Sequence, residues 1–143
     1  MNSLSFPDVN VWLALLLEDH VHRPAARRWW DTDRSDIIGF IRFTQIAILR
    51  LLTTAAAMNG KPLSMAEAWK AYDRLYADER VAFLDEPAGG IETTFRQFTR
   101  QRHASLKLWA DAWLLAFAES AGGTVVTFDQ ALAARAQNAL LLS

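Results

Sequence analysis

The chain has no cysteine among its 143 residues and only three histidines. The lack of thiols excludes a disulfide framework and thiolate metal sites, and it fits a reducing compartment. The histidines, His20, His22 and His103, are too few and too poorly associated with the acidic residues discussed below to indicate a zinc site. We therefore assign them no metal role.

An excess of either charge is also missing, since 15 Lys and Arg oppose 16 Asp and Glu for a formal net charge of -1. Any contact with nucleic acid must therefore rest on a local basic patch. The most apolar stretch, residues 11–17, is far shorter than the ~20 residues that a membrane span requires. The amino terminus lacks the charged start and long apolar run of a signal peptide, so we expect a cytoplasmic protein with no membrane association.

The length and composition are those of one globular domain. Hydrophobic residues make up 52% of the chain and charged residues 22%, which gives enough apolar surface for a core. Short apolar runs alternate with longer helix-like segments, a pattern typical of βα units on a parallel sheet. We expect a single α/β domain over residues 1–143.

The apolar runs and their flanking turn residues predict the elements. Strands are expected over residues 4–6, 36–43, 81–84 and 124–128, with an edge strand over 140–142. Helices are expected over residues 9–17, 24–30, 44–58, 64–78, 91–102, 106–120 and 130–137. Ser64-Met-Ala-Glu67 has the capping-box pattern, which makes that helix start the firmest boundary. Thr44 is the predicted cap of the third helix.

Three aspartates occupy positions where side chains can converge. Asp8 follows the first predicted strand, Asp129 follows the fourth, and Asp111 lies in the apolar helix between them. In open parallel sheets, ligands bind in the crevice outside the carboxyl ends of the strands. A carboxylate cluster suits Mg²⁺ or Mn²⁺, and such an ion can activate water and neutralise charge on a phosphoryl group. The pattern predicts hydrolysis of a phosphodiester.

Each aspartate also has a structural explanation. Asp8 and Asp129 immediately precede predicted helices, so either can be a helix N-cap, a role compatible with metal binding. The neighbours of Asp111 are apolar on both sides, which predicts a helix buried on most faces, where a carboxylate is costly unless it is paired or bound to a cation. A helix that starts nearer to Asp111 would make this residue a cap too, although Ser105 favours an earlier start.

Several segments resemble a known family. Phe6-Pro-Asp8-Val-Asn10-Val-Trp-Leu, Asp111-Ala-Trp-Leu-Leu-Ala-Phe-Ala118 and Thr127-Phe-Asp129 resemble, in this order, the blocks of PIN-domain nucleases. Residues 21–30 and Thr44-Gln-Ile-Ala-Ile-Leu-Arg50 resemble the VapC toxins of bacterial toxin-antitoxin pairs. The resemblance spans the whole chain.

The resemblance implies a PIN-like three-layer sandwich, with a central parallel sheet of about five strands and helices on both faces. It implies an Mg²⁺ or Mn²⁺ site in which Asp8, Asp111 and Asp129 are metal ligands and catalytic residues. The implied activity is endonucleolytic cleavage of RNA by a toxin, and the implied partners are a VapB-like antitoxin and a second toxin copy. Six Trp and eight Phe suit such an interface.

The sequence departs from the family at Gln45, because the family usually has a Glu near the start of the third helix. Glutamine offers an oxygen without a charge, so weaker metal binding is expected. Its amide can still ligate an ion or orient a water, which makes Gln45 a fourth candidate catalytic residue. The alternative is a polar residue with no role beyond the first helical turn. A PIN-like binding module with a weakened site is the corresponding alternative function.

Basic residues near the predicted site are candidates for RNA contact. Arg100, Arg102 and Lys107 precede the helix of Asp111, and Arg50 lies in the segment that resembles VapC toxins. Neutralised phosphates give RNA binding its affinity. An ordinary solvated helix face explains the first group equally well, and Arg50 can instead pair with the carboxylates. A phosphoacceptor receiver domain is not supported, because the first strand lacks a following acidic pair and the last lacks a following lysine.

Overall fold

The computed structural model describes residues 3–86 and 89–143. Its five strands form one parallel sheet in the order β3-β2-β1-β4-β5. The strands are β1 (Leu4–Pro7), β2 (Ile37–Phe40), β3 (Val81–Phe83), β4 (Thr124–Thr127) and β5 (Ala139–Leu141). The central pair is β1 and β4, in which Ser5 lies opposite Thr124 and Pro7 opposite Val126. The chain therefore leaves both strands at the same edge of the sheet.

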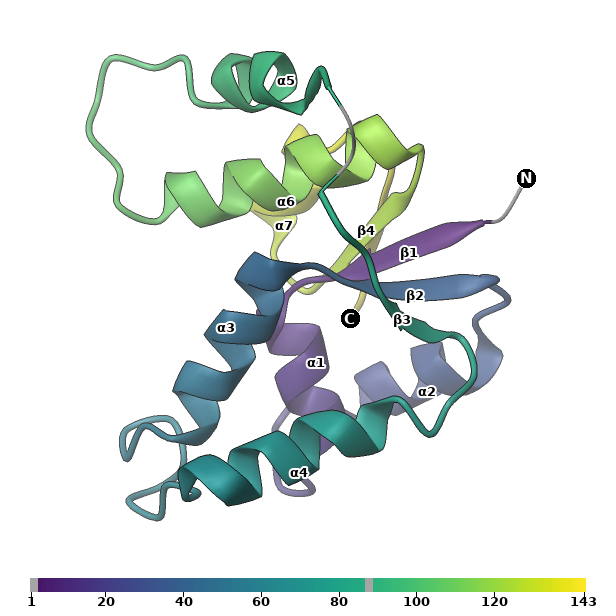
Figure 1. Ribbon diagram of the computed structural model, residues 1–143, viewed down its shortest axis with the longest axis vertical. Coiled ribbons are helices and arrows are strands. Elements are labelled where there is room, and N and C mark those ends of the chain that lie inside the picture. The colour runs from purple at the N-terminus through teal and green to yellow at the C-terminus, as the bar shows by residue number, and fades with distance from the viewer. Residues whose placement is uncertain (1–2, 87–88) are drawn as a thin grey trace.

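Helices cover both faces of the sheet (Figure 1). One face packs against α1 (Val9–Leu16), α2 (Arg23–Thr32), α3 (Arg42–Leu52) and α4 (Met65–Leu75). The other packs against α5 (Ile91–Phe98), α6 (Leu108–Ala121) and α7 (Gln130–Arg135). The predicted three-layer α/β sandwich is confirmed. Among the described residues, no helix is long and apolar enough to cross a membrane.

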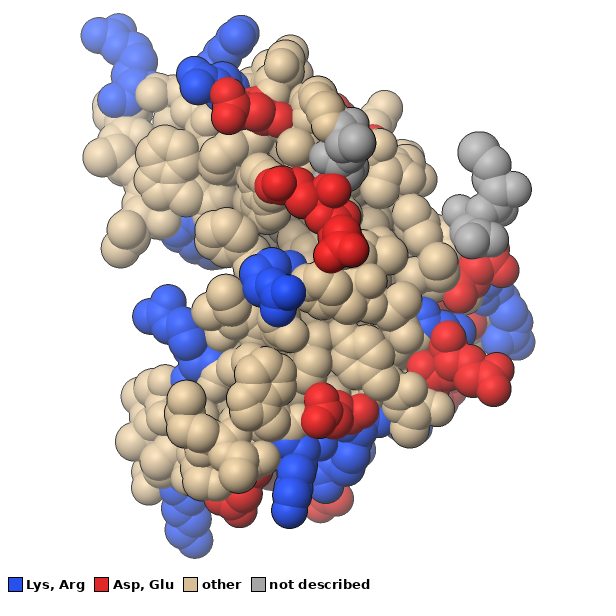
Figure 2. Space-filling view, viewed as in Figure 1, with Lys and Arg blue, Asp and Glu red and all other residues tan. Residues whose placement is uncertain are grey.

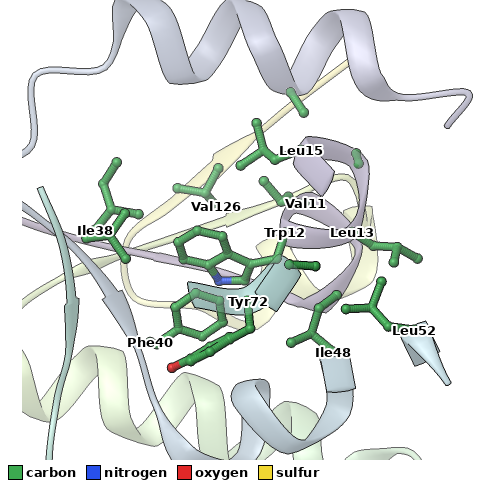
Figure 3. Packing of buried hydrophobic residues seen from close by; sticks show 14 of the residues in the cluster. Val11, Trp12, Leu13, Leu15, Ile38, Phe40, Ile48, Leu52, Tyr72 and Val126 are labelled. Atoms are coloured by element: carbon green, nitrogen blue, oxygen red, sulfur yellow. The ribbon is translucent and has the colours of Figure 1, made fainter. Parts of the chain in front are cut away.

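The larger core lies on the α1–α4 face and is centred on Trp12. The indole ring stacks on Phe40, with ring centroids 3.9 Å apart and planes within 17° of parallel. Tyr72 of α4 meets the other side of Phe40 edge-on, and Ile48 of α3 borders the same cluster (Figure 3). This packing fixes the first turn of α1, and therefore Asp8 directly before it, against the sheet.

The smaller core lies on the α5–α7 face and is centred on Phe6. Its ring meets Phe117 of α6 edge-on at 5.7 Å between centroids. Gly123 approaches the ring so closely that a Cβ there would lie 2.4 Å from Phe6 Cε2. This close approach allows the turn from α6 into β4 to lie flat against the central strand.

Several predicted boundaries were wrong. Helix α3 begins at Arg42, so Thr44 is a buried residue inside the helix and does not cap it. The helix ends at Leu52 rather than near residue 58, because residues 54–60 form turns that end in left-handed backbone at Asn59 and Gly60. The strand predicted to reach residue 43 ends at Phe40.

Two helices on the second face of the sheet also have boundaries that differ from the prediction. Helix α5 stops at Phe98 rather than residue 102, and α6 starts at Leu108 rather than residue 106. The capping box before α4 is confirmed, because the backbone N–H of Glu67 donates to Ser64 Oγ and that of Ser64 donates to Glu67 Oε1. That residues 1–143 make up a single domain stays a prediction.

The contact between Gly123 and Phe6 generates a stability test. Gly123→Ala should destabilise the protein by about 1–3 kcal/mol, because the added methyl collides with the fully buried ring of Phe6. Chemical denaturation measures the loss. In the background of Phe6→Leu, which removes the ring edge, the alanine should cost clearly less. Equal costs in the two backgrounds would show that the ring contact does not determine the need for glycine.

Candidate active site

A hollow of about 410 Å³ lies at the carboxyl ends of β1 and β4, between α3 and α6. In the space-filling view, the surface is indented between the parts of the molecule that contain these helices, and basic side chains lie along the indentation (Figure 2). The hollow is lined by the acidic residues Asp8, Asp111 and Asp129, and by the basic residues Arg42, Arg50 and Lys107. The structure thus brings together the three aspartates that the sequence singled out.

Asp8 is the most buried of these carboxylates and is also the N-cap of α1. Its Oδ1 accepts a hydrogen bond from the backbone N–H of Val11 at 3.2 Å, and its Oδ2 accepts one from the hydroxyl of Thr127. Burial is the main reason why the pKa of Asp8 is raised above its usual value, and the charges of Asp111 and Asp129 add to the effect. Capping and membership of the site therefore coincide in this residue.

Asp129 is the N-cap of α7 and carries a lowered pKa. Its Oδ1 accepts hydrogen bonds from the N–H groups of Ala131 and Leu132, while Oδ2 accepts one from Lys107 Nζ at 3.0 Å. The hydrogen bond from Lys107 is the largest cause of the lowered pKa. Asp129 is therefore the carboxylate whose charge the fold stabilises most directly.

Thr127 connects these two aspartates, and the sequence analysis did not assign it a role. Its fully buried hydroxyl donates to Asp8 and accepts from the backbone N–H of Asp129 at 2.9 Å. Pro7, the last residue of β1, pairs with Val126. The residues that follow these two along the chain, Asp8 and Thr127, therefore lie side by side. The available signal was a hydroxyl residue two positions before Asp129.

Asp111 occupies the first turn of α6, and its surroundings differ from the expectation. The predicted burial on most sides holds only for the later turns, because Trp109 is 56% exposed and the Asp111 side chain is 28% exposed. Partial burial is still the main cause of its raised pKa, which the positive charge of Lys107 opposes. A negative charge in the first turn also interacts favourably with the helix dipole.

The predicted basic residues separate into two groups. Lys107 and Arg50 line the hollow. Arg100 and Arg102 lie in the connection between α5 and α6, and neither lines the hollow; Arg102 borders a separate depression beside Trp109. Arg42, which the sequence analysis did not consider, lines the hollow at the start of α3.

Gln45 does not line the hollow. It is only 7% exposed, and its Oε1 accepts a hydrogen bond from Arg42 Nη1. The residues of α3 that face the hollow include Thr44, Ala47 and Arg50, which recur at the spacing of one helical face. The expected ligand at position 45 is therefore turned away, and Ala47, two residues further on, has a small side chain on the side that faces the hollow.

The donor chemistry of the hollow fits a hard divalent cation. Its acidic groups provide carboxylate oxygens, the ligands that Mg²⁺ and Mn²⁺ prefer. The charges of Asp111 and Asp129 both raise the pKa of Asp8, which indicates that the three groups lie within electrostatic reach of one another. Within residues 3–86 and 89–143, however, no three acidic or histidine side chains already have the spacing of a metal centre. An ion held by all three carboxylates would therefore require their side chains to adjust.

Fold and hollow together define an α/β protein with an acidic site at the carboxyl edge of a parallel sheet. Residues 5–138 match the PIN domain family. Ribonuclease VapC41 of Mycobacterium tuberculosis is 41% identical over 128 residues, which cover 87% of this chain and 88% of the relative. Ribonuclease VapC44 of the same organism is 32% identical, over 88% of this chain and 86% of the relative. The chain therefore belongs to the PIN domain family, within which its relatives are VapC ribonucleases.

Solved structures share the fold at lower sequence identity. The toxin VapC20 of Mycobacterium tuberculosis, described as cleaving the sarcin-ricin loop, superposes with a TM-score of 0.66 at 18% identity and covers 91% of this chain and 93% of its own. FitAcB from Neisseria gonorrhoeae superposes with a TM-score of 0.59 at 22% identity, over 96% of each chain. These likenesses bear on the fold alone.

The opposite pKa shifts of Asp8 and Asp129 predict opposite effects on stability. The raised pKa of Asp8 means that its ionised form destabilises the fold, so stability falls as pH rises from the unfolded-state pKa to the folded-state pKa. At neutral pH in EDTA, Asp8→Asn should therefore stabilise the protein by about 1 kcal/mol, or raise Tm by about 3 °C, while keeping the cap.

Asp129→Asn is the matched control in the same thermal melts. The lowered pKa of Asp129 means that its charge stabilises the fold above the unfolded-state pKa, and that this contribution is lost as pH falls through the folded-state pKa. The substitution should therefore lower Tm slightly or leave it unchanged. A fall in Tm for Asp8→Asn would contradict the electrostatic interpretation of the site.

The orientation of α3 predicts which position can accept a fourth carboxylate. Ala47→Glu should strengthen Mn²⁺ binding about tenfold, because it adds a charged oxygen ligand on the side that faces the hollow. Gln45→Glu should leave the affinity nearly unchanged, because the Gln45 side chain is buried against Arg42 and does not itself line the hollow. Titration calorimetry compares the two variants with the unmodified protein. The reverse ranking would show that position 45 faces the ion.

Proposed function

We propose that this chain is a metal-dependent endoribonuclease, the toxin of a toxin-antitoxin pair, with Asp8, Asp111 and Asp129 as its catalytic and metal-binding residues. The main support is the convergence of three carboxylates, from segments far apart in the sequence, in one hollow at the carboxyl ends of the central strands. VapC relatives over most of the chain support the activity on RNA.

The three carboxylates of the site are positioned in different ways. Asp8 is held on two sides by Thr127 and the N–H of Val11, so its carboxylate has a fixed position. Asp111 lies on the first turn of α6, and Asp129 lies directly before α7. When bound to these oxygens, Mg²⁺ or Mn²⁺ would supply Lewis acidity and an activated water for phosphodiester hydrolysis.

Positive charges on the rim suit the phosphates of a single-stranded or looped RNA. Lys107, directly before α6, and Arg50 of α3 border the hollow, and Arg42 adds a third charge at the start of α3. Their position beside the carboxylates makes them the preferred phosphate contacts. Arg100 and Arg102 lie outside the hollow and can serve only a longer RNA.

A protein partner is the best explanation for the apolar surface around the hollow. Large exposed side chains on α3, α4 and α6 include Phe43, Ile46, Met65, Trp69 and Trp109. Solved neighbours include VapBC-1 from Haemophilus influenzae and FitAB bound to DNA. We infer that a VapB-like antitoxin and a second toxin copy cover this surface. The proposed RNA substrate supports a cytoplasmic location for the protein.

Cleavage of a mixed RNA substrate tests the proposed function. We expect cleavage with Mg²⁺ and with Mn²⁺ and none in EDTA, and a reduction of at least about 100-fold for Asp8→Asn, since the central carboxylate is lost. Arg96→Gln is the control, because its side chain is exposed on α5, pairs with Glu92 and does not line the hollow. Gel analysis of 5′-labelled RNA measures the rate.

The expected growth arrest on expression should disappear with Asp8→Asn and persist with Arg96→Gln. Metal-independent cleavage, or equal rates for Asp8→Asn and the unmodified protein, would overturn the assignment of the site. Tight RNA binding without cleavage on any of several RNAs would instead favour the binding-module function.

A further inference from the structure

Lys107 holds a position that the proposed function does not explain by phosphate contact alone. Its Nζ lies 3.0 Å from Asp129 Oδ2 and 3.8 Å from Asp111 Oδ2. One ammonium group thus bridges two of the three carboxylates of the hollow. The third carboxylate, Asp8, is close enough for its charge to affect Lys107 as well.

The local sequence explains how one side chain reaches both acids. Lys107 directly precedes α6 and lies four residues before Asp111, so the two side chains occupy the same side of the first helical turn. Asp129 is fixed as the cap of α7, and its second oxygen is free to face the lysine. The Lys107 side chain is 72% exposed, so no packing holds the ammonium group in place.

The charge on Lys107 competes with any other cation at these oxygens. A divalent ion that ligates Asp111 and Asp129 needs the same lone pairs that face the ammonium group. Two positive charges in this space repel each other, and the lysine stem is flexible enough to move outward. In the described residues, the three carboxylates lie too far apart to form a metal centre as they stand. An ammonium group between Asp111 and Asp129 is consistent with this spacing.

We propose that Lys107 is a tethered counter-ion that neutralises Asp111 and Asp129 in the metal-free protein and must leave them when a divalent ion binds. The inference rests on the proposed metal site. It makes Lys107 a residue that sets the metal concentration at which the site fills. The Lys107 ammonium group is then free to move to the edge of the hollow, where it would bind a phosphate of the substrate.

Binding of Mn²⁺ to the whole protein, measured by titration calorimetry, tests the inference. Lys107→Met keeps the length of the side chain and removes its charge, and we expect Mn²⁺ to bind about fivefold more tightly, the effect of removing two partly exposed ion pairs. Lys107→Arg keeps the charge and should bind Mn²⁺ like the unmodified protein. Lys61→Met is the matched control at an exposed lysine outside the hollow.

Thermal melts in EDTA provide the second measurement. Without its counter-ion, the acidic cluster repels itself, so Lys107→Met should lower the Tm of the metal-free protein, and Mn²⁺ should restore more of it than in the unmodified protein. If Lys107 instead maintained the shape of the site, Lys107→Met would bind Mn²⁺ more weakly than the unmodified protein.

The outcomes separate this inference from the proposed function. Binding of Mn²⁺ to the unmodified protein that Lys107→Met weakens or leaves unchanged would overturn the counter-ion role and leave the metal site intact. Binding that appears only in Lys107→Met would support the counter-ion role strongly. No binding in either protein would overturn both.

Discussion

The parallel pairing of β1 with β4 is the constraint on which the site depends. These strands are far apart in the sequence, yet their register places Asp8 beside Thr127, and the buried threonine hydroxyl joins Asp8 to the backbone of Asp129. Packing on both faces maintains this register, with Trp12 on one side and Phe6 on the other. Damage to either core would therefore displace the carboxylates.

The carboxylates of the site repel one another when they are ionised, and favourable contacts elsewhere in the fold must offset this repulsion. Asp8 loses solvation on burial and faces two other carboxylates, so its ionised form is costly. Helix N-termini, the Thr127 hydroxyl and the ammonium group of Lys107 compensate in part. A divalent cation would relieve the repulsion further, which is the physical reason to expect metal binding to stabilise this protein.

The sequence predicted the fold class and the acidic residues well, and the details of α3 poorly. The alternation of apolar runs with helical segments indicated the parallel sheet, and the motifs around Asp8, Asp111 and Asp129 indicated the site. The start of α3 was misplaced by two residues because Thr44 has the chemistry of a cap, although burial inside the helix decides its role. Gln45 was expected in the hollow for a related reason, since family resemblance indicates a residue type and not a helix face.

By itself, the sequence determined which acidic residues form the candidate site and their local placement, with Asp8 and Asp129 after strands and Asp111 in a helix, because those features depend on local order and composition. Only the tertiary structure decided which side chains meet. Asp111 became partly exposed because α6 begins at Leu108. Gln45 became buried against Arg42 and does not line the hollow, and Lys107 came to bridge Asp111 and Asp129. These outcomes depend on helix starts and on the register of distant strands, which arise from long-range packing that no local pattern encodes.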